Sequence, residues 1–258
     1  MPYTTIDKSS DHFQTETWSS QDTSIDTINF APDWVWIKSR TNADTQILFD
    51  SVRGANKRLS SSGNTGESTT SDELTAFNSD GYTLGTGSNV NRSGHDYVSW
   101  NWLAGGTAPA ITYSVKVVSD SGNKYRFDDF GTSAVTLDLQ EGGTYTFDQS
   151  DSSNSGHPLR FSTTSDGSHG GGSEYTTGVT TTGTPGSAGA KTVITVGSGV
   201  ATLYYYCTQH SGMGGQANTN STHGSSNFSG SIQANVSANT TAGFSIVSYT
   251  GTGSNATV

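Results

Sequence analysis

The sequence has few charged residues and a single cysteine, and each shortage excludes a class of protein. Charged residues make up 13% of the 258 positions, and 22 acidic residues outweigh 12 basic ones to give a net charge of −10. Nucleic acids require a basic stripe and anionic membranes attract basic segments, so neither is expected as a partner. The one cysteine, Cys207, excludes an internal disulfide framework.

Long apolar runs and catalytic signatures are also missing. No segment approaches the length of a membrane span, and residues 1–8 lack the apolar core of a secretory signal. We therefore expect a chain made in a cytoplasm, without export or membrane insertion. There is no Gly-x-Ser-x-Gly or His-Glu-x-x-His motif, and the acidic pair Asp128–Asp129 is typical of a turn. The chain is predicted not to be an enzyme.

What the sequence does contain is aromatic residues in short apolar bursts. Its 5 Trp, 11 Tyr and 10 Phe are separated by turns rich in Gly, Asn, Asp and Ser, a pattern typical of β-sandwiches and barrels. An all-β chain is predicted, with a helical signal only at 71–77. In residues 33–39, alternation places Trp34, Trp36 and Lys38 on one face of a strand, opposite Val35 and Ile37.

The spacing of the bursts predicts two β-sandwich domains. Residues 1–104 form the first, and a Gly-rich linker follows at 105–110. Residues 111–218 form the second, with seven short strands and a polar surface loop at 165–190. Residues 219–242 are predicted to be another linker. Residues 243–258 open with an alternating strand like the first strand of the chain, so they either start a further β-domain or complete a neighbouring sheet.

One constellation of residues carries chemistry. Cys207, His210 and Met213 follow the apolar strand 203–206, and His157 precedes another strand fifty residues upstream. Two His, one Cys and a weak axial Met form the trigonal ligand set of blue-copper sites. A strand that delivers Cys207 to the end of a sandwich, followed by a tight loop, brings these side chains to one point. The alternative is a metal-free sandwich in which Cys207 is a small buried hydrophobe.

The remaining histidines and the basic cluster show no such pattern. Residues 53–58 hold three basic side chains and are predicted to be a solvated turn rather than a phosphate site. The histidines without a ligand-like context, predicted to lie on the surface or in loops, are His12, His95, His169 and His223.

Residues 112–217 resemble the cupredoxin family, the small blue copper proteins such as plastocyanin and amicyanin. The Cys-x2-His-x2-Met spacing is similar to that of amicyanin, and the segment 145–147 and His157 come in the family's order. The resemblance implies a Greek-key β-sandwich with copper as cofactor, held by His157, Cys207, His210 and Met213. Pro158 departs from the family, which commonly has here an Asn that ties the ligand loops together, so the surroundings of the ligands are expected to differ.

Residues 3–104 resemble a concanavalin-like, jelly-roll β-domain of structural proteins of marine tailed phages. The segments that carry this resemblance are 32–38, 48–54, 77–85 and 97–102, and it restarts at Phe244. It implies a virion protein, such as a tail fibre, tail-associated protein or capsid decoration, made in the bacterial host cytoplasm and exposed on the particle. The implied partners are other virion proteins, further copies of the chain and a host-surface glycan used in host attachment. The alternative function is a blue-copper electron-transfer protein.

Overall fold

The computed structural model describes residues 8–20, 22–105, 108–220 and 224–258. Almost all of its regular structure is β-strand, which confirms the predicted all-β class. The chain divides into two compact units. The first joins the N-terminal residues up to 107 with residues 237–248, and the second joins 108–236 with 249–258. None of the helices in the described ranges has the length and apolar composition needed to cross a membrane.

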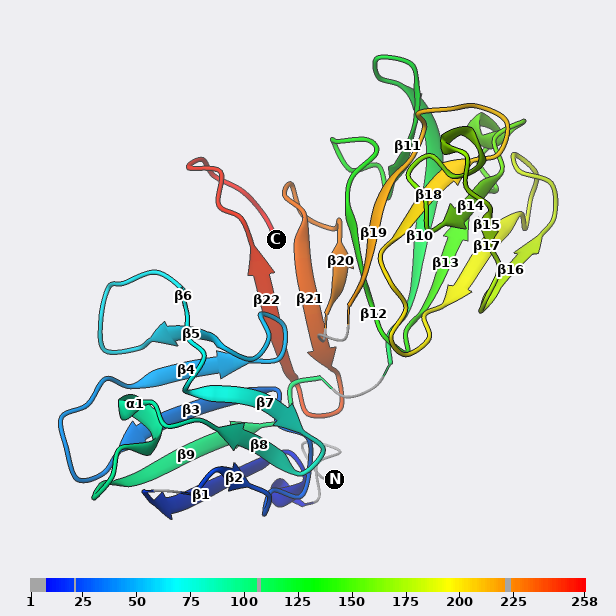
Figure 1. Ribbon diagram of the computed structural model, residues 1–258. Helices are drawn as coiled ribbons and strands as arrows, with labels where there is room; N and C mark the ends of the chain where they lie inside the picture. Colours follow the sequence, from blue (N-terminus) through cyan, green and yellow to red (C-terminus); the bar gives the residue numbers. More distant parts are fainter. Residues whose placement is uncertain (1–7, 21, 106–107, 221–223) are drawn as a thin grey trace, which may run out of the picture. The chain divides into compact units, whose positions relative to one another are not determined.

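The first unit contains two antiparallel sheets with a shared core. Its elements up to residue 102 are η1 (Ser9–Asp11), β1 (Phe13–Ser19), β2 (Ser24–Ile25), β3 (Trp34–Ser39), β4 (Ile47–Asp50), β5 (Lys57–Ser60), β6 (Ser68–Thr69), β7 (Leu74–Asn78), β8 (Gly81–Leu84), α1 (Ser88–Asn91) and β9 (Asp96–Trp102). The larger sheet has the order β1-β9-β3-β4-β5-β6 and the smaller one β2-β8-β7 (Figure 1).

The alternation in β3 sorts its side chains as predicted. Val35 and Ile37 are fully buried, whereas Trp34 and Trp36 are half-buried on the other face of the sheet. β9 continues this aromatic face, because Trp102 lies opposite Trp34 and Trp100 lies opposite Trp36. The buried face of the larger sheet packs into the core of the first unit, together with side chains of the smaller sheet. Local hydrophobic alternation therefore decides which face of β3 is internal.

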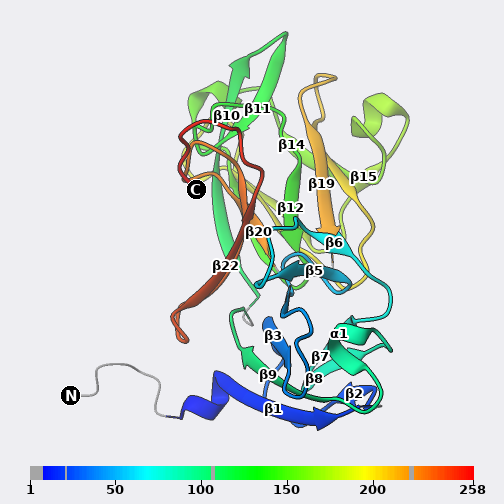
Figure 2. The same ribbon diagram turned by 90° about the vertical axis from the view of Figure 1, so that its left-hand side faces the viewer.

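The second unit is a sandwich of two five-stranded sheets. Its elements are β10 (Ala110–Ser119), β11 (Asn123–Phe127), β12 (Leu137–Gln140), β13 (Thr144–Asp148), η2 (Ser152–Asn154), β14 (Leu159–Ser162), η3 (Gly167–Gly170), β15 (Glu174–Tyr175), β16 (Val179–Thr182), β17 (Lys191–Thr195), β18 (Leu203–Cys207), β19 (Gly215–Asn220) and β20 (Ser225–Asn227). One sheet has the order β11-β10-β13-β17-β16 and the other β12-β19-β18-β14-β15. Figure 2 shows β10 and β11 as a long antiparallel hairpin.

Aromatic rings fill the space between these two sheets. Phe127 packs against Phe147 with ring centroids 5.6 Å apart and against Tyr205 at 5.2 Å, and all three side chains are almost fully buried. Phe147 also meets Phe161 edge-on at 5.5 Å. Rings in such tilted and edge-on pairs add to the free energy gained from burying their apolar area. This core supports the end of the sheet from which the candidate ligands project.

The predicted linker at 219–242 is wrong, because it contains β20 and all of β21 (Ala234–Asn239). Its single aromatic residue, Phe228, is only 4% exposed and packs against Tyr113 at 5.6 Å and Phe130 at 5.3 Å. This one buried ring attaches to the core of the second unit a segment whose composition is otherwise that of a loop. The predicted linker at 105–110 lies partly outside the described residues, and β10 begins at Ala110.

The C-terminal strand belongs to a sheet with the two strands that precede it. β22 (Phe244–Tyr249) is the last strand of a three-stranded sheet with the order β20-β21-β22. Within the first unit its Phe244 ring lies 6.1 Å from that of Trp34 and 6.3 Å from that of Trp102. The strand resembles β1 in sequence because both place an aromatic side chain on the same tryptophan face, where Phe13 meets Trp102 at 4.8 Å.

Three smaller expectations are also corrected. Residues 71–77 form no helix, since β7 pairs with β8, and the one-turn helix lies at 88–91. The polar stretch 165–190 contains η3 and the short strands β15 and β16. The basic cluster is not a solvated turn: Arg53 is 2.6 Å from Asp50, and Arg58, in β5, is 2.6 Å from the buried Glu73. Because carboxylates neutralise these cations, the cluster offers no anion site.

Candidate metal centre

Strand pairing brings the first two candidate ligands to the same end of the second unit. β14 and β18 are antiparallel neighbours, and Leu159 lies opposite Cys207. His157 precedes Leu159 by two residues, so its side chain starts beside the end of β18. Pro158 between them has no N–H to donate, but its carbonyl accepts a hydrogen bond from the Thr208 N–H at 3.2 Å. The strand register therefore places an imidazole next to the thiol.

The loop after β18 brings in the third ligand. The Cys207 sulfur lies 3.9 Å from Nδ1 of His157 and 3.7 Å from Nδ1 of His210. One ligand atom from each of these three residues lies within 4.8 Å of the other two. The two imidazole rings are 4.6 Å apart, centroid to centroid. Three residues separated by up to fifty-three positions in the sequence thus converge on one point, as predicted.

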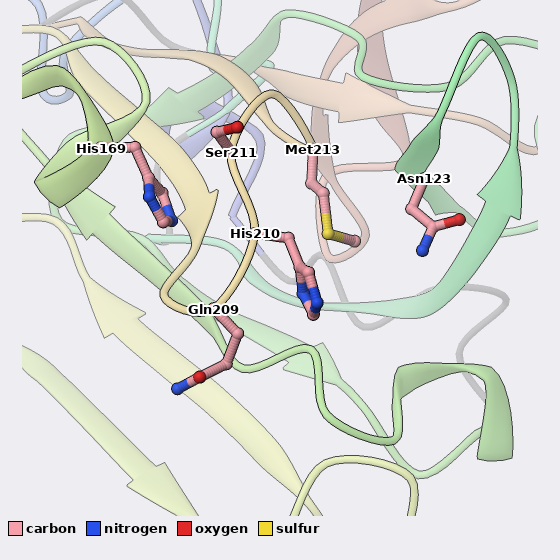
Figure 3. A pocket seen from close by; sticks show the side chains of 6 residues that line it. All are labelled: Asn123, His169, Gln209, His210, Ser211 and Met213. Carbon is pink, nitrogen blue, oxygen red and sulfur yellow. The ribbon is translucent and has the colours of Figure 1, made fainter.

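The fourth predicted ligand, Met213, belongs to the same loop. It is 1% exposed and packs in the core of the second unit, and its carbonyl accepts a hydrogen bond from the Tyr125 N–H at 2.9 Å. Figure 3 shows the Met213 and His210 side chains next to one another, and both line the same depression. A buried thioether beside a histidine is what a weak axial ligand requires.

Burial and the neighbouring His210 favour the neutral, metal-binding form of His157. Burial lowers the pKa of His157, and the neighbouring His210 lowers it further. His157 therefore stays a neutral imidazole to lower pH than a free histidine does, and the neutral imidazole is the form that binds a metal ion. Cys207 is fully buried, whereas His210 is exposed. The site is closed on the thiol side and open at His210.

The donor set fits a soft transition-metal ion. Bonds of about 2.0–2.3 Å to one ion place two ligand atoms roughly 3.5 Å apart, so separations of 3.7 and 3.9 Å need only a small adjustment. Both imidazoles turn Nδ1 toward the sulfur, so a metal ion bound at these two atoms would leave the proton on Nε2. Thiolate and thioether ligands select copper(I), zinc and iron–sulfur clusters, and two His with one Cys and a long Met are typical of copper.

A shallow depression of about 480 Å³ opens beside the centre. It is lined by Asn123, His169, Gln209, His210, Ser211 and Met213 (Figure 3), which are polar side chains apart from the thioether. His169 belongs here although its sequence context gave no sign of it: its Nε2 lies 3.0 Å from the Cys207 carbonyl oxygen. Two residues that are not part of the loop hold it in place. Asp166 accepts a hydrogen bond from the Gly212 N–H at 2.9 Å, and the Lys124 ammonium donates to the Gly212 carbonyl.

Two of the other histidines belong to the first unit, and the third lies outside the residues that the structure describes. His95 is in the first unit, where its Nδ1 is 3.4 Å from the Asp44 carboxylate. His12 is half-buried beside β1, and His223 is outside the described residues. Sequence order thus predicted the three residues that converge, but it missed His169 and two buried neighbours of the candidate ligands, Tyr125 and Gln149.

These two neighbours hold the main chain of the first ligand. The Tyr125 hydroxyl donates to the His157 carbonyl at 2.9 Å, and Nε2 of Gln149 donates to the same oxygen at 2.8 Å. Burial, and then the adjacent Cys207, raises the pKa of Tyr125. The hydroxyl therefore stays protonated at neutral pH and remains a donor.

Comparison with known proteins gives a family but no activity. The model of a family described as a domain of unknown function, DUF7483, matches residues 8–130 and 216–258. All four candidate ligands lie between these two stretches. No curated protein and no solved structure matches the chain. Because the two stretches cover more than half of the residues, the chain belongs to the DUF7483 family.

Proposed function

We propose that the second unit binds one copper ion through His157, Cys207 and His210, with Met213 as a weak fourth ligand. The observation that carries this proposal is the convergence of two Nδ1 atoms on the Cys207 sulfur, at 3.9 and 3.7 Å. Copper held by such a set supplies one-electron exchange between Cu(II) and Cu(I). The buried Cys207 keeps water from the thiolate, and the exposed His210 leaves one ligand within reach of a partner.

A titration of the full chain with Cu(II) tests this function. The expected result is uptake of one copper per chain, with an intense thiolate-to-copper absorption that Cys207→Ser abolishes. His95→Gln is the matched control, because His95 lies in the first unit and faces Asp44. A colourless wild-type chain without stoichiometric copper contradicts the proposal. So does tight zinc binding by a chain that develops no copper–thiolate absorption.

We propose as a second function that the chain is an oligomeric structural component of a phage particle, as the resemblance of residues 3–104 implies. The observation in favour is the apolar edge at β22. Among the described residues, the exposed large hydrophobic side chains are Val247, Tyr249 and Val258, all near the C-terminal end. Residues 192–258 contain no Asp, Glu, Lys or Arg. Edge strands are usually protected by charge or proline, and exposed apolar patches often mark an interface.

Two experiments test the structural role. Sedimentation of the wild-type chain is expected to show an oligomer that Val247→Lys and Tyr249→Lys dissociate, while Thr252→Lys, which adds the same charge at a nearby exposed position, does not. Mass spectrometry of purified particles is expected to find the chain at many copies, resistant to salt washing. A monomer found only in the soluble lysate contradicts this role and leaves the electron-transfer function.

A further inference from the structure

The residue after the first candidate histidine offers no hydrogen-bond donor that could hold the His157 peptide. Pro158 occupies that position and has neither an N–H nor a polar side chain. A flexible peptide at His157 would let its imidazole drift from the ligand position, because ring orientation follows the main chain. The structure shows instead that the His157 carbonyl oxygen accepts two hydrogen bonds, from Tyr125 and from Gln149.

Gln149 spans the proline with its side-chain amide. Its Nε2 donates to the His157 carbonyl at 2.8 Å, and its Oε1 accepts from the Leu159 N–H at 3.1 Å. Leu159 lies opposite Cys207 in the β14–β18 pair, so one amide connects the His157 peptide to the strand pair that carries the thiol. The side chain is 1% exposed, and the peptide of Gln149 is itself hydrogen-bonded on both sides, to Ala190 and from Gly186, each at 2.8 Å.

Tyr125 connects two ligand residues. Its N–H donates to the Met213 carbonyl at 2.9 Å, and its hydroxyl donates to the His157 carbonyl at 2.9 Å. The residue is fully buried in β11, and its ring packs 6.4 Å from that of Tyr205. A rigid phenol fixed at both ends sets the spacing between the loop of Met213 and the segment of His157.

We propose that Tyr125 and Gln149 are positioning residues of the metal centre, which hold the His157 peptide from two sides beside a proline that offers no donor. The inference rests on the proposed copper binding. Its physical basis is preorganisation: a carbonyl held by two buried donors keeps one peptide orientation, so the imidazole is in place before the ion arrives. Each bond is neutral and shielded from water, so salt does not screen it.

Two variants of the full chain remove these bonds with little change of shape. Tyr125→Phe deletes one hydroxyl and keeps the ring, and Gln149→Leu deletes the three amide contacts, to His157, Leu159 and Asn154. Tyr113→Phe is the matched control for the first, since the Tyr113 hydroxyl is also buried and donates to a main-chain carbonyl, that of Ser226, at 2.7 Å. Gln140→Leu is the control for the second: Gln140 is 8% exposed, binds the Gly224 N–H, and pairs with the far end of β19.

The measurements are the copper dissociation constant, the thiolate-to-copper absorption and the electron paramagnetic resonance spectrum of Cu(II). Loss of an outer partner of a ligand weakens metal binding about 10- to 100-fold, and this is the expected effect of Tyr125→Phe and of Gln149→Leu, with an altered spectrum. The two controls are expected to keep the wild-type spectrum and affinity. Denaturant unfolding of the metal-free variants verifies that all four fold, and it separates lost stability from lost positioning.

The outcomes are distinguishable from failure of the proposed function. A wild-type chain that takes up no copper overturns copper binding, and the positioning of a ligand with it. A wild-type chain that binds copper, with both Tyr125→Phe and Gln149→Leu keeping its affinity and spectrum, overturns the positioning inference alone. Equal losses in the test variants and in their matched controls also overturn it, because they indicate a general effect of a missing buried hydrogen bond.

Discussion

The Cys207 sulfur lies 3.7 Å from Nδ1 of His210, three residues further along the chain. After His210 the chain turns back into β19. Gly214 is the residue at which the returning chain approaches β18 most closely. A Cβ atom at position 214 would collide with the carbonyl of Tyr205, which belongs to the strand of Cys207. The geometry of the candidate centre therefore depends on a glycine that is not a ligand.

Gly214→Ala is expected to distort this loop and to weaken copper binding. Forcing extra atoms into a packed site typically costs about 1–3 kcal/mol of stability, and here the displaced segment carries His210 and Met213. Denaturant unfolding and copper titration measure the two effects. Gly131→Ala is the control, because a Cβ there meets no atom within 4 Å. If Gly214→Ala kept the wild-type stability and copper affinity, the loop would not pack against Tyr205 as described.

Met213→Leu is expected to keep copper but to raise its reduction potential, because the variant removes a donor that stabilises Cu(II). Met213→Gln offers a harder oxygen donor, which favours Cu(II), and is expected to lower the potential. The Leu substitution conserves volume at this buried position, so it should cost less than about 1.5 kcal/mol of stability. Voltammetry of the copper-loaded chain measures the potential. Equal potentials in all three chains would exclude Met213 as a ligand.

Phe228→Ala is expected to destabilise the second unit by about 3–5 kcal/mol, the usual range for deleting a buried Phe. The ring contacts Tyr113, Phe127 and Phe130 in the core although it lies in a polar segment. Chemical unfolding followed by tyrosine fluorescence measures the loss. Thr252→Ala is the control, because Thr252 is exposed and surface changes usually stay within about 0.5 kcal/mol. Equal stability of both variants would contradict the placement of β20.

Phe244→Ala is expected to shift the tryptophan emission to longer wavelength, because it uncovers part of Trp34 and Trp102. The Phe244 ring centroid lies 6.1 and 6.3 Å from theirs, and each aromatic pair contributes about 0.5–1.5 kcal/mol beyond its buried area. Val247→Ala, on the same strand but 44% exposed, serves as the control. An emission spectrum identical to that of the wild type would mean that β22 does not cover the aromatic face.

Local patterns in the sequence were sufficient for several parts of the structure. The alternation of side chains along residues 34–39 decided which of them enter the core, since successive side chains of a strand point to opposite faces of the sheet. The convergence of His157, Cys207 and His210 could be predicted as well, because the residue types needed for a soft ion are rare and three of them fall within seven residues. Both signals are short in sequence and chemically specific.

Tertiary structure alone decided the rest. Phe228 and β22 are single apolar features in polar surroundings, and their burial depends on which sheet they meet, not on their neighbours in the chain. Tyr125 and Gln149 come within reach of His157 only once β11, β13 and β14 are assembled, across separations of 32 and 8 residues. A hydrogen bond to a main-chain carbonyl leaves no trace in the sequence, because every residue has a carbonyl and only the fold selects which one is met.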